Sequence, residues 1–194
     1  MMRIITGRAR GVRLATLAGE NTRPTAERTK EAIFSMIQFE ISGARVLDLF
    51  AGSGQMGLEA LSRGAAHAVL CDRARDAVEV IRQNALKTRL APDCEILCND
   101  FESVLRMQRN KEAFDLVFLD PPYAIGAIPK ALGLLVAYGL LRDGATVVCE
   151  SASEDDVFAS DAALEARFEV LRRTHYGVAH VTLLRYVGDG EVAQ

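Results

Sequence analysis

Tryptophan is absent from this chain of 194 residues, and histidine, cysteine and proline are scarce, with three, four and five copies. The histidines are scattered and the cysteines show no Cys-x-x-Cys spacing, so we expect no metal site. All four cysteines lie in apolar runs, which predicts small buried side chains in a reducing compartment. The low proline content excludes a proline-rich linker protein.

Long hydrophobic runs are also missing. The longest uncharged stretch of note, residues 131–141, has eleven residues, whereas a membrane span needs about 20. The first eight residues lack the apolar core of a signal peptide. These absences predict a cytoplasmic protein that makes no membrane contact. Hydrophobic residues still make up 49% of the chain, which is enough for the core of one domain.

Positive charge is concentrated at the start of the chain. The whole chain has a net charge of −3, but residues 1–30 carry +5 and the remaining 164 residues carry −8. A basic segment on an acidic body fits contact with a phosphate backbone through one face. An ordinary solvated surface is the alternative, and charge alone does not separate the two. The candidate RNA contacts are Arg3, Arg8, Arg10 and Arg13.

Short apolar runs alternate with helical patterns along most of the chain. The expected strands are residues 45–50, 68–71, 94–97, 114–119, 145–149, 168–174 and 178–185. The expected helices are residues 25–41, 55–63, 75–88 and 126–139, preceded by a hairpin of residues 3–6 and 12–15. This alternation predicts a doubly wound α/β fold with a mostly parallel sheet and an antiparallel strand pair at its C-terminal edge. We expect a basic N-terminal arm (1–24), one domain (25–187) and a frayed tail (188–194).

A glycine-rich loop follows the first strand. Residues 52–57 read Gly-Ser-Gly-Gln-Met-Gly, and Asp72 ends the second strand. Such glycines let a backbone approach a nucleotide ligand, and the acid binds ribose hydroxyls. Asp48 precedes the loop and would repel a pyrophosphate but attract a sulfonium and an ammonium group, so S-adenosylmethionine fits better than NAD. A tight turn without a ligand is the remaining alternative.

A second motif, Asp120-Pro121-Pro122-Tyr123, follows the fourth strand. Ligands of open α/β sheets bind outside the carboxyl ends of the strands, where this motif and the glycine loop would both lie. The Asp carboxylate and a proline carbonyl can accept both hydrogens of an amino group and favour the positive nitrogen that develops during methyl transfer. Tyr123 offers a flat face for stacking a base. The alternative is a rigid turn whose Asp caps a helix.

Together these motifs resemble the RsmD family. The likeness runs from Arg3 to about Tyr186 and is carried by residues 48–54, 57–65 and 120–123, by Arg3-Ile4-Ile5-Thr6-Gly7, by Thr22-Arg23-Pro24-Thr25 and by Tyr176-Gly177. It implies a Rossmann-like class I methyltransferase fold with a seven-stranded sheet. It also implies that the chain uses S-adenosylmethionine to methylate a guanine exocyclic amine in 16S rRNA, within the assembled small ribosomal subunit.

The resemblance implies roles for individual residues as well. The implied cofactor-binding residues are Thr25, Asp48, Phe50, Gly52, Gly54, Asp72, Asp100 and Phe101. In this set Asp48 faces the methionine end, Asp72 holds the ribose, and Asp100 with Phe101 receives the adenine. Thr25 would reach the methionine carboxylate, although helix capping also explains a Thr there. The implied catalytic residues are Asp120 and Pro121, which hold the target amine, and Tyr123, which stacks on the base.

Three other function classes deserve comparison with this interpretation. An NAD-dependent oxidoreductase would need a hydride-transfer site, and the sequence shows neither a Tyr-x-x-x-Lys motif nor a catalytic histidine near a strand end. A non-catalytic RNA-binding module would leave the glycine loop and Asp120 without a purpose. DNA adenine methylases share versions of the second motif, but they usually carry a separate target-recognition domain, so RNA is the favoured substrate.

Overall fold

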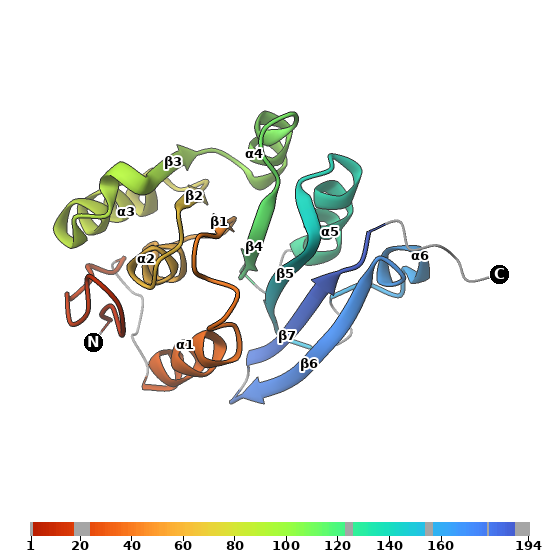
Figure 1. Ribbon diagram of the computed structural model, residues 1–194, viewed down its shortest axis with the longest axis horizontal. Helices are drawn as coiled ribbons and strands as arrows, with labels where there is room; N and C mark the ends of the chain where they lie inside the picture. Colours follow the sequence, from red (N-terminus) through yellow and green to blue (C-terminus); the bar gives the residue numbers. More distant parts are fainter. Residues whose placement is uncertain (1, 18–23, 123–125, 154–156, 178, 189–194) are drawn as a thin grey trace.

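Seven strands form one sheet in the described part of this computed structural model, which comprises residues 2–17, 24–122, 126–153, 157–177 and 179–188. The strands are β1 (Arg45–Asp48), β2 (His67–Asp72), β3 (Cys94–Cys98), β4 (Phe114–Leu119), β5 (Leu141–Ser151), β6 (Phe168–Tyr176) and β7 (Ala179–Tyr186). The helices are α1 (Pro24–Met36), α2 (Gln55–Ser62), α3 (Arg75–Thr88), α4 (Phe101–Gln108), α5 (Ala127–Ala137) and α6 (Ala162–Glu165), with a 3-10 turn at Ala91–Asp93. Figure 1 shows the helices on both faces of the sheet.

The strand order is β3-β2-β1-β4-β5-β7-β6. Strands β1 to β5 pair in parallel, whereas β7 runs antiparallel to both β5 and β6. This arrangement confirms the predicted doubly wound α/β fold with an antiparallel C-terminal strand. The order reverses between β1 and β4, so the chain has its topological switch point there, and ligands of such sheets bind outside the strand ends at that point.

Alternate residues of the central strands supply two apolar cores. Val46, Phe118 and Val148 belong to the core on the face that carries α1, α2 and α3. Leu47 and Cys149 belong to the core under α4 and α5. Successive side chains of a strand point to opposite faces, so a strand that is covered on both faces needs a continuous apolar run. The apolar runs of β1, β4 and β5 meet this requirement, as their sequences predict.

Several elements differ from their predicted extents. The first helix ends at Met36 instead of continuing to about residue 41, because the chain turns there and still buries Ile37 and Ile41. Helix α4 was not predicted, although Asp100 caps it by accepting a hydrogen bond from the Ser103 N–H. The short α6 lies outside all of the predicted helices. The expected N-terminal hairpin is reduced to one antiparallel bridge between two arginines, Arg3 and Arg13.

The burial predicted for the cysteines is correct for Cys71 and Cys149. It is wrong for Cys98, which is exposed because it ends β3, the strand at the edge of the sheet. Cys94, at the start of the same strand, is half-buried. None of the helices in the described residues is long and apolar enough to cross a membrane.

Polar side chains of α2 and α3 hold the N-terminal segment, residues 2–17, against the domain. Glu59 is fully buried and accepts hydrogen bonds from the backbone N–H groups of Ile5 (2.7 Å) and Thr6 (3.0 Å). Asn84 is also fully buried and bonds both backbone groups of Ala15 at 2.8 and 3.0 Å. These bonds add to the backbone hydrogen bonds that join the two arms of the segment, such as the one from the Leu14 N–H to the Met2 carbonyl at 3.0 Å.

One basic residue counted in the +5 of the N-terminal region does not face solvent. Lys30 is 3% exposed, forms an ion pair with Glu59 at 3.6 Å and donates a hydrogen bond to the Arg3 carbonyl at 2.7 Å. Burial lowers the pKa of its ammonium group, and the facing Glu59 carboxylate opposes that shift. Lys30, which belongs to α1, therefore links the N-terminal segment to α1 and α2. It is not part of the surface offered to a partner.

Candidate functional site

A cleft of about 870 Å³ opens at the carboxyl ends of the parallel strands. Its lining includes residues 49–53 after β1, Asp72 at the end of β2, residues 99–102 after β3 and residues 120–122 after β4. The two sequence motifs therefore meet in one cleft, as the topological rule predicts. A volume of this size is typical of a small-molecule or cofactor site, for which the usual range is roughly 300–1,000 Å³.

The glycine loop makes the turn from β1 into α2. Gly52 and Gly54 have φ angles of 53° and 78°, in the left-handed region that favours glycine. Gly57 has a different purpose, because a Cβ there would lie 2.2 Å from the Leu70 side chain. The first two glycines thus shape the loop, and the third allows α2 to pack closely on β2. Gly52 lines the cleft directly, whereas Gly54 lies behind it, against Ile81 of α3.

Asp72 is held rigidly at the edge of the cleft. One carboxylate oxygen accepts a hydrogen bond from the Gly52 N–H at 3.0 Å, and the other accepts one from the Ala74 N–H at 2.8 Å. A carboxylate has about four acceptor positions, so each oxygen can still accept a hydrogen bond from a ligand. Asp72 therefore joins the glycine loop to the start of α3 and presents acceptors suited to ribose hydroxyls.

The far wall of the cleft combines an acid with two aromatic rings. Asp100 caps α4 through the Ser103 N–H at 2.8 Å, and this hydrogen bond holds the pKa of the exposed carboxyl below its usual range. The rings of Phe50 and Phe101 lie 5.4 Å apart at an interplanar angle of 48°, and both residues line the cleft. An apolar wall beside an ionised acceptor is suited to a purine that carries an amino group.

Asp48 lies beneath the loop and is not among the residues that line the cleft. It is 3% exposed, and one carboxylate oxygen accepts a hydrogen bond from the Gly57 N–H at 3.0 Å. Burial raises the pKa of Asp48 to about 7, against the effect of that hydrogen bond, and the negative charge of Asp72 adds to the rise. Asp48 thus supports the turn from within and adds negative potential below the cleft.

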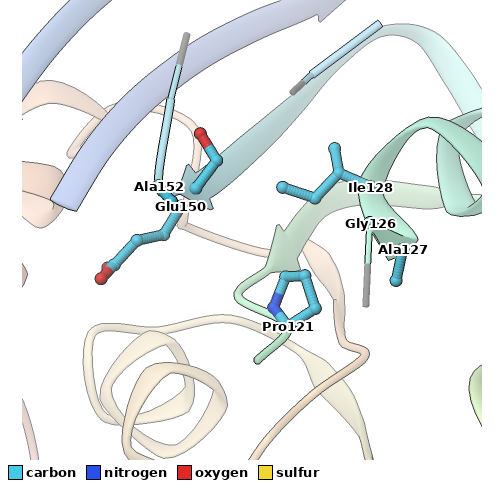
Figure 2. A pocket seen from close by; sticks show the side chains of 7 residues that line it. Pro121, Gly126, Ala127, Ile128, Glu150 and Ala152 are labelled. Atoms are coloured by element: carbon cyan, nitrogen blue, oxygen red, sulfur yellow. The ribbon is translucent and has the colours of Figure 1, made fainter. Parts of the chain in front are cut away.

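The second motif borders a further, smaller pocket. Asp120 and Pro122 are exposed, Pro121 is buried, and all three line the main cleft. A pocket of about 70 Å³ also borders Pro121 (Figure 2). Its lining residues are Pro121, Gly126, Ala127, Ile128, Glu150, Ser151 and Ala152. The ends of β4 and β5 and the start of α5 therefore surround a hollow next to the proposed amine-binding motif.

Two of the implied site residues cannot be placed. Tyr123 lies outside the described residues. Thr25 is in the first turn of α1, but its side chain is outside the described part of the chain. The predicted stacking by Tyr123 and the predicted contact of Thr25 with a methionine carboxylate therefore stay predictions.

The four candidate RNA-binding arginines are exposed, but they differ in their partners. Arg3 forms an ion pair with Glu27 at 2.8 Å, and Arg8 forms one with Asp93. Arg10 and Arg13 form no ion pair within the described residues. The positive charge that the N-terminal segment offers to a partner is therefore strongest at Arg10 and Arg13.

Sequence reasoning missed some residues of the site. Met2 and Leu17, at the two ends of the N-terminal segment, line the cleft, as does Lys130 of α5. Asn84 donates a hydrogen bond to the Ser53 carbonyl at 2.9 Å and so connects the N-terminal segment to the glycine loop. A signal for Asn84 was present, because this amide follows Ile81 on the apolar face of a predicted helix, and a buried polar group needs a specific partner.

Among the described residues, no group of three or more His, Cys, Asp or Glu side chains could hold a metal ion.

Comparisons with known proteins show the family to which the chain belongs. A family model described as "Conserved hypothetical protein 95" matches residues 2–185. The chain is 35% identical over 188 residues to "Putative rRNA methyltransferase YlbH" of Bacillus subtilis (strain 168), covering 96% of this chain and 100% of that protein. It is 36% identical over 154 residues to "Ribosomal RNA small subunit methyltransferase D" of Escherichia coli (strain K12), covering 79% and 76%.

A solved structure extends the comparison to the fold. "Putative methyltransferase yhhF from Escherichia coli" aligns with a TM-score of 0.84 and 30% identity, over 97% of this chain and 99% of that one. The strand order and the antiparallel C-terminal strand described above are those of a class I methyltransferase fold.

Proposed function

Because this chain belongs to the family described as "Conserved hypothetical protein 95", we propose that it is an S-adenosylmethionine-dependent methyltransferase that modifies a guanine exocyclic amine in 16S rRNA. The observation that carries the proposal is the single cleft shared by the glycine loop, Asp72 and the Asp120 motif. The names of the relatives, an rRNA methyltransferase and a small-subunit rRNA methyltransferase, support the substrate class. The assembled small ribosomal subunit in the cytoplasm is the proposed partner.

The residues of the cleft fit S-adenosylmethionine. Asp72 keeps acceptor positions for ribose hydroxyls, and Asp100 with the ring of Phe101 suits an adenine. The acids around the strand ends attract a ligand that bears a sulfonium and an ammonium group, and they would repel a pyrophosphate. When bound, this cofactor supplies an electrophilic methyl group with a neutral leaving group. The acidity of the cleft therefore favours a methyltransferase over an NAD-dependent oxidoreductase.

On the other side of the cleft, Asp120 and Pro121 would position the target amine. An exocyclic amine is a poor nucleophile because its lone pair is delocalised into the base. The Asp120 carboxylate and the Pro121 carbonyl would accept the two amine hydrogens, and they would stabilise the positive charge that develops on the nitrogen. Since methyl transfer is an in-line displacement, its rate depends mainly on this positioning. Asp120 therefore acts as a hydrogen-bond acceptor more than as a strong base, and the nitrogen, made acidic by its positive charge, loses its extra proton after the methyl transfer.

The proposal is tested by methyl transfer in vitro. The purified protein is incubated with isotopically labelled S-adenosylmethionine and either small-subunit particles or naked 16S rRNA, both taken from cells that lack the enzyme. We expect labelled N2-methylguanosine after digestion to nucleosides, with particles as the better substrate. Label in N6-methyladenosine would overturn the choice of guanine. RNA binding without any transfer would instead favour the non-catalytic RNA-binding module.

A further inference from the structure

Strand β5 brings a second carboxylate next to the Asp120 motif. In the parallel pairing of β4 with β5, Leu119 is the register partner of Cys149. The residues that follow, Asp120 and Glu150, therefore lie side by side at the ends of neighbouring strands, which are about 4.8 Å apart.

The direction of the Glu150 side chain follows from the alternation along β5. Cys149 belongs to the core under α4 and α5, whereas Val148 belongs to the core on the α1 face. Glu150 thus points to the α1 face, and its register partner on β7, Val181, belongs to the same core. Figure 2 shows the carboxylate directed away from Ile128, which lies on the opposite face.

Glu150 also lines the small pocket, which adjoins the main cleft. The two hollows share Pro121, Gly126 and Ala127 in their linings. Apart from Glu150 and Ser151, the side chains that line the small pocket are apolar. A base whose amine is held at Asp120 and Pro121 would lie beside the end of β5, next to this half-buried carboxylate.

The chemistry of the base edge decides what Glu150 can accept. Guanine presents an N1–H beside its exocyclic amine, so two adjacent groups donate hydrogen bonds. Adenine presents an amine beside N1, which is an acceptor and would be repelled by a carboxylate. A carboxylate has about four acceptor positions, so Glu150 can bind a base N–H together with a protein partner. Enzymes that act on an extruded base commonly read its Watson–Crick edge in this way.

We propose that Glu150 is the residue that selects guanine, by accepting the N1–H of the base whose amine Asp120 and Pro121 hold. This inference rests on the proposed function and adds the determinant of base specificity to it. It also explains how a motif shared with adenine-directed enzymes can serve a guanine, because the discriminating group lies on the neighbouring strand.

The test compares two bases at the modified position, which is first located with the wild-type protein. RNA carrying guanine or 2-aminopurine at that position is assembled into small-subunit particles. 2-Aminopurine keeps the exocyclic amine but has an acceptor at N1. We expect the wild-type protein to prefer guanine at least tenfold in kcat/KM. Glu150→Gln, whose amide can donate to N1, should reduce this preference at least tenfold.

Two further variants keep the test decisive. Glu150→Ala removes both the attraction to guanine and the repulsion of 2-aminopurine, so the preference for guanine should fall in this variant too. It provides the test if Glu150→Gln does not fold. Glu165→Gln, at an exposed carboxylate on α6, is the matched control and should keep the wild-type preference. An unchanged preference in folded Glu150 variants that bind S-adenosylhomocysteine normally would overturn the role of Glu150. Failure of the wild-type protein to methylate guanine at all would instead overturn the proposed function.

Discussion

Two buried carboxylates of this protein, Asp48 and Glu59, have very different surroundings. Glu59 faces Lys30 and Arg63 and accepts two backbone N–H groups. Asp48 faces no cation within the described residues, and the Gly57 N–H is its hydrogen-bond donor. A buried charge without a counter-ion is costly, and the group tends to take up a proton instead. The absence of a counter-ion in the described residues therefore agrees with the raised pKa of Asp48.

The first prediction concerns the pH dependence that Asp48 imposes on stability. Its pKa is about 7 in the folded protein, above the ordinary value of 3.8, so the folded state holds the proton more tightly. The contribution of Asp48 is most favourable below about pH 4 and is lost as the pH rises through 7. Asp48→Asn keeps an acceptor for Gly57 without the charge. We expect its unfolding free energy, relative to wild type, to rise by up to about 4 kcal/mol between pH 4 and pH 8.

Urea denaturation across this pH range, in the absence of cofactor, measures the difference in unfolding free energy between Asp48→Asn and wild type. Glu112→Gln replaces an exposed carboxylate and serves as the control, for which the difference should not change with pH. A difference between Asp48→Asn and wild type that is equally flat would show that folding does not raise the pKa of Asp48.

The second prediction concerns Asp72. Asp72→Ala removes the acceptors for the ribose and also those for Gly52 and Ala74, so it weakens the cofactor site in two ways. Hydrogen bonds to a charged group contribute about 1.5–3 kcal/mol, so S-adenosylhomocysteine should bind roughly 10- to 150-fold more weakly in calorimetry. Asp76→Ala, in the first turn of α3 and outside the cleft lining, is the control. Equal affinities for wild type and Asp72→Ala would remove Asp72 from the site.

At the scale of elements, sequence patterns predicted those helices and strands whose boundaries depend on nearby residues. The helix 75–88 and the strand 114–119 agree with the structure to the residue, because their apolar periods are clear. The meeting of the two motifs was also predictable, since the carboxyl ends of parallel strands share one edge of a sheet. The position of the N-terminal segment was not predictable. It depends on hydrogen bonds to Glu59 and Asn84, which are more than 50 residues away along the chain.

The third prediction tests how this segment is held. Glu59→Ala would leave Lys30 buried without its counter-ion and the N–H groups of Ile5 and Thr6 without their acceptor. Loss of one member of a buried ion pair costs about 3–5 kcal/mol, and denaturation at pH 7 should show a loss of this size. Glu79→Ala, which breaks an exposed pair with Arg82 at 3.9 Å, should cost less than about 1 kcal/mol. Similar losses for the two variants would contradict the anchoring role of Glu59.

At the scale of the whole molecule, the distribution of charge matters more than its sum. The chain carries −3 overall, yet the N-terminal segment that borders the cleft is basic. Arg10 and Arg13 have no ion pair within the described residues, and Lys30 is buried. The N-terminal segment is therefore the part of the surface that we expect an RNA backbone to contact.

The fourth prediction follows from this asymmetry. The double variant Arg10→Glu/Arg13→Glu should bind RNA more weakly, and the slope of log affinity against log salt should decrease by about 1–2, as expected for one or two lost phosphate contacts. Its affinity for S-adenosylhomocysteine should not change. The variant Arg172→Glu/Arg173→Glu makes the same change in net charge on the edge strand β6. If both variants weaken RNA binding equally, the N-terminal arginines have no special role.

The most direct measurement is mass spectrometry of 16S rRNA nucleosides from a strain that lacks this protein. We expect the loss of one N2-methylguanosine per rRNA and its full return with the wild-type protein. Asp120→Ala should not restore it, whereas Asp120→Asn, which keeps one acceptor oxygen, should restore it in part. If the deletion strain retains all of its N2-methylguanosine, or if Asp120→Ala restores it fully, then this protein does not methylate guanine through the Asp120 site.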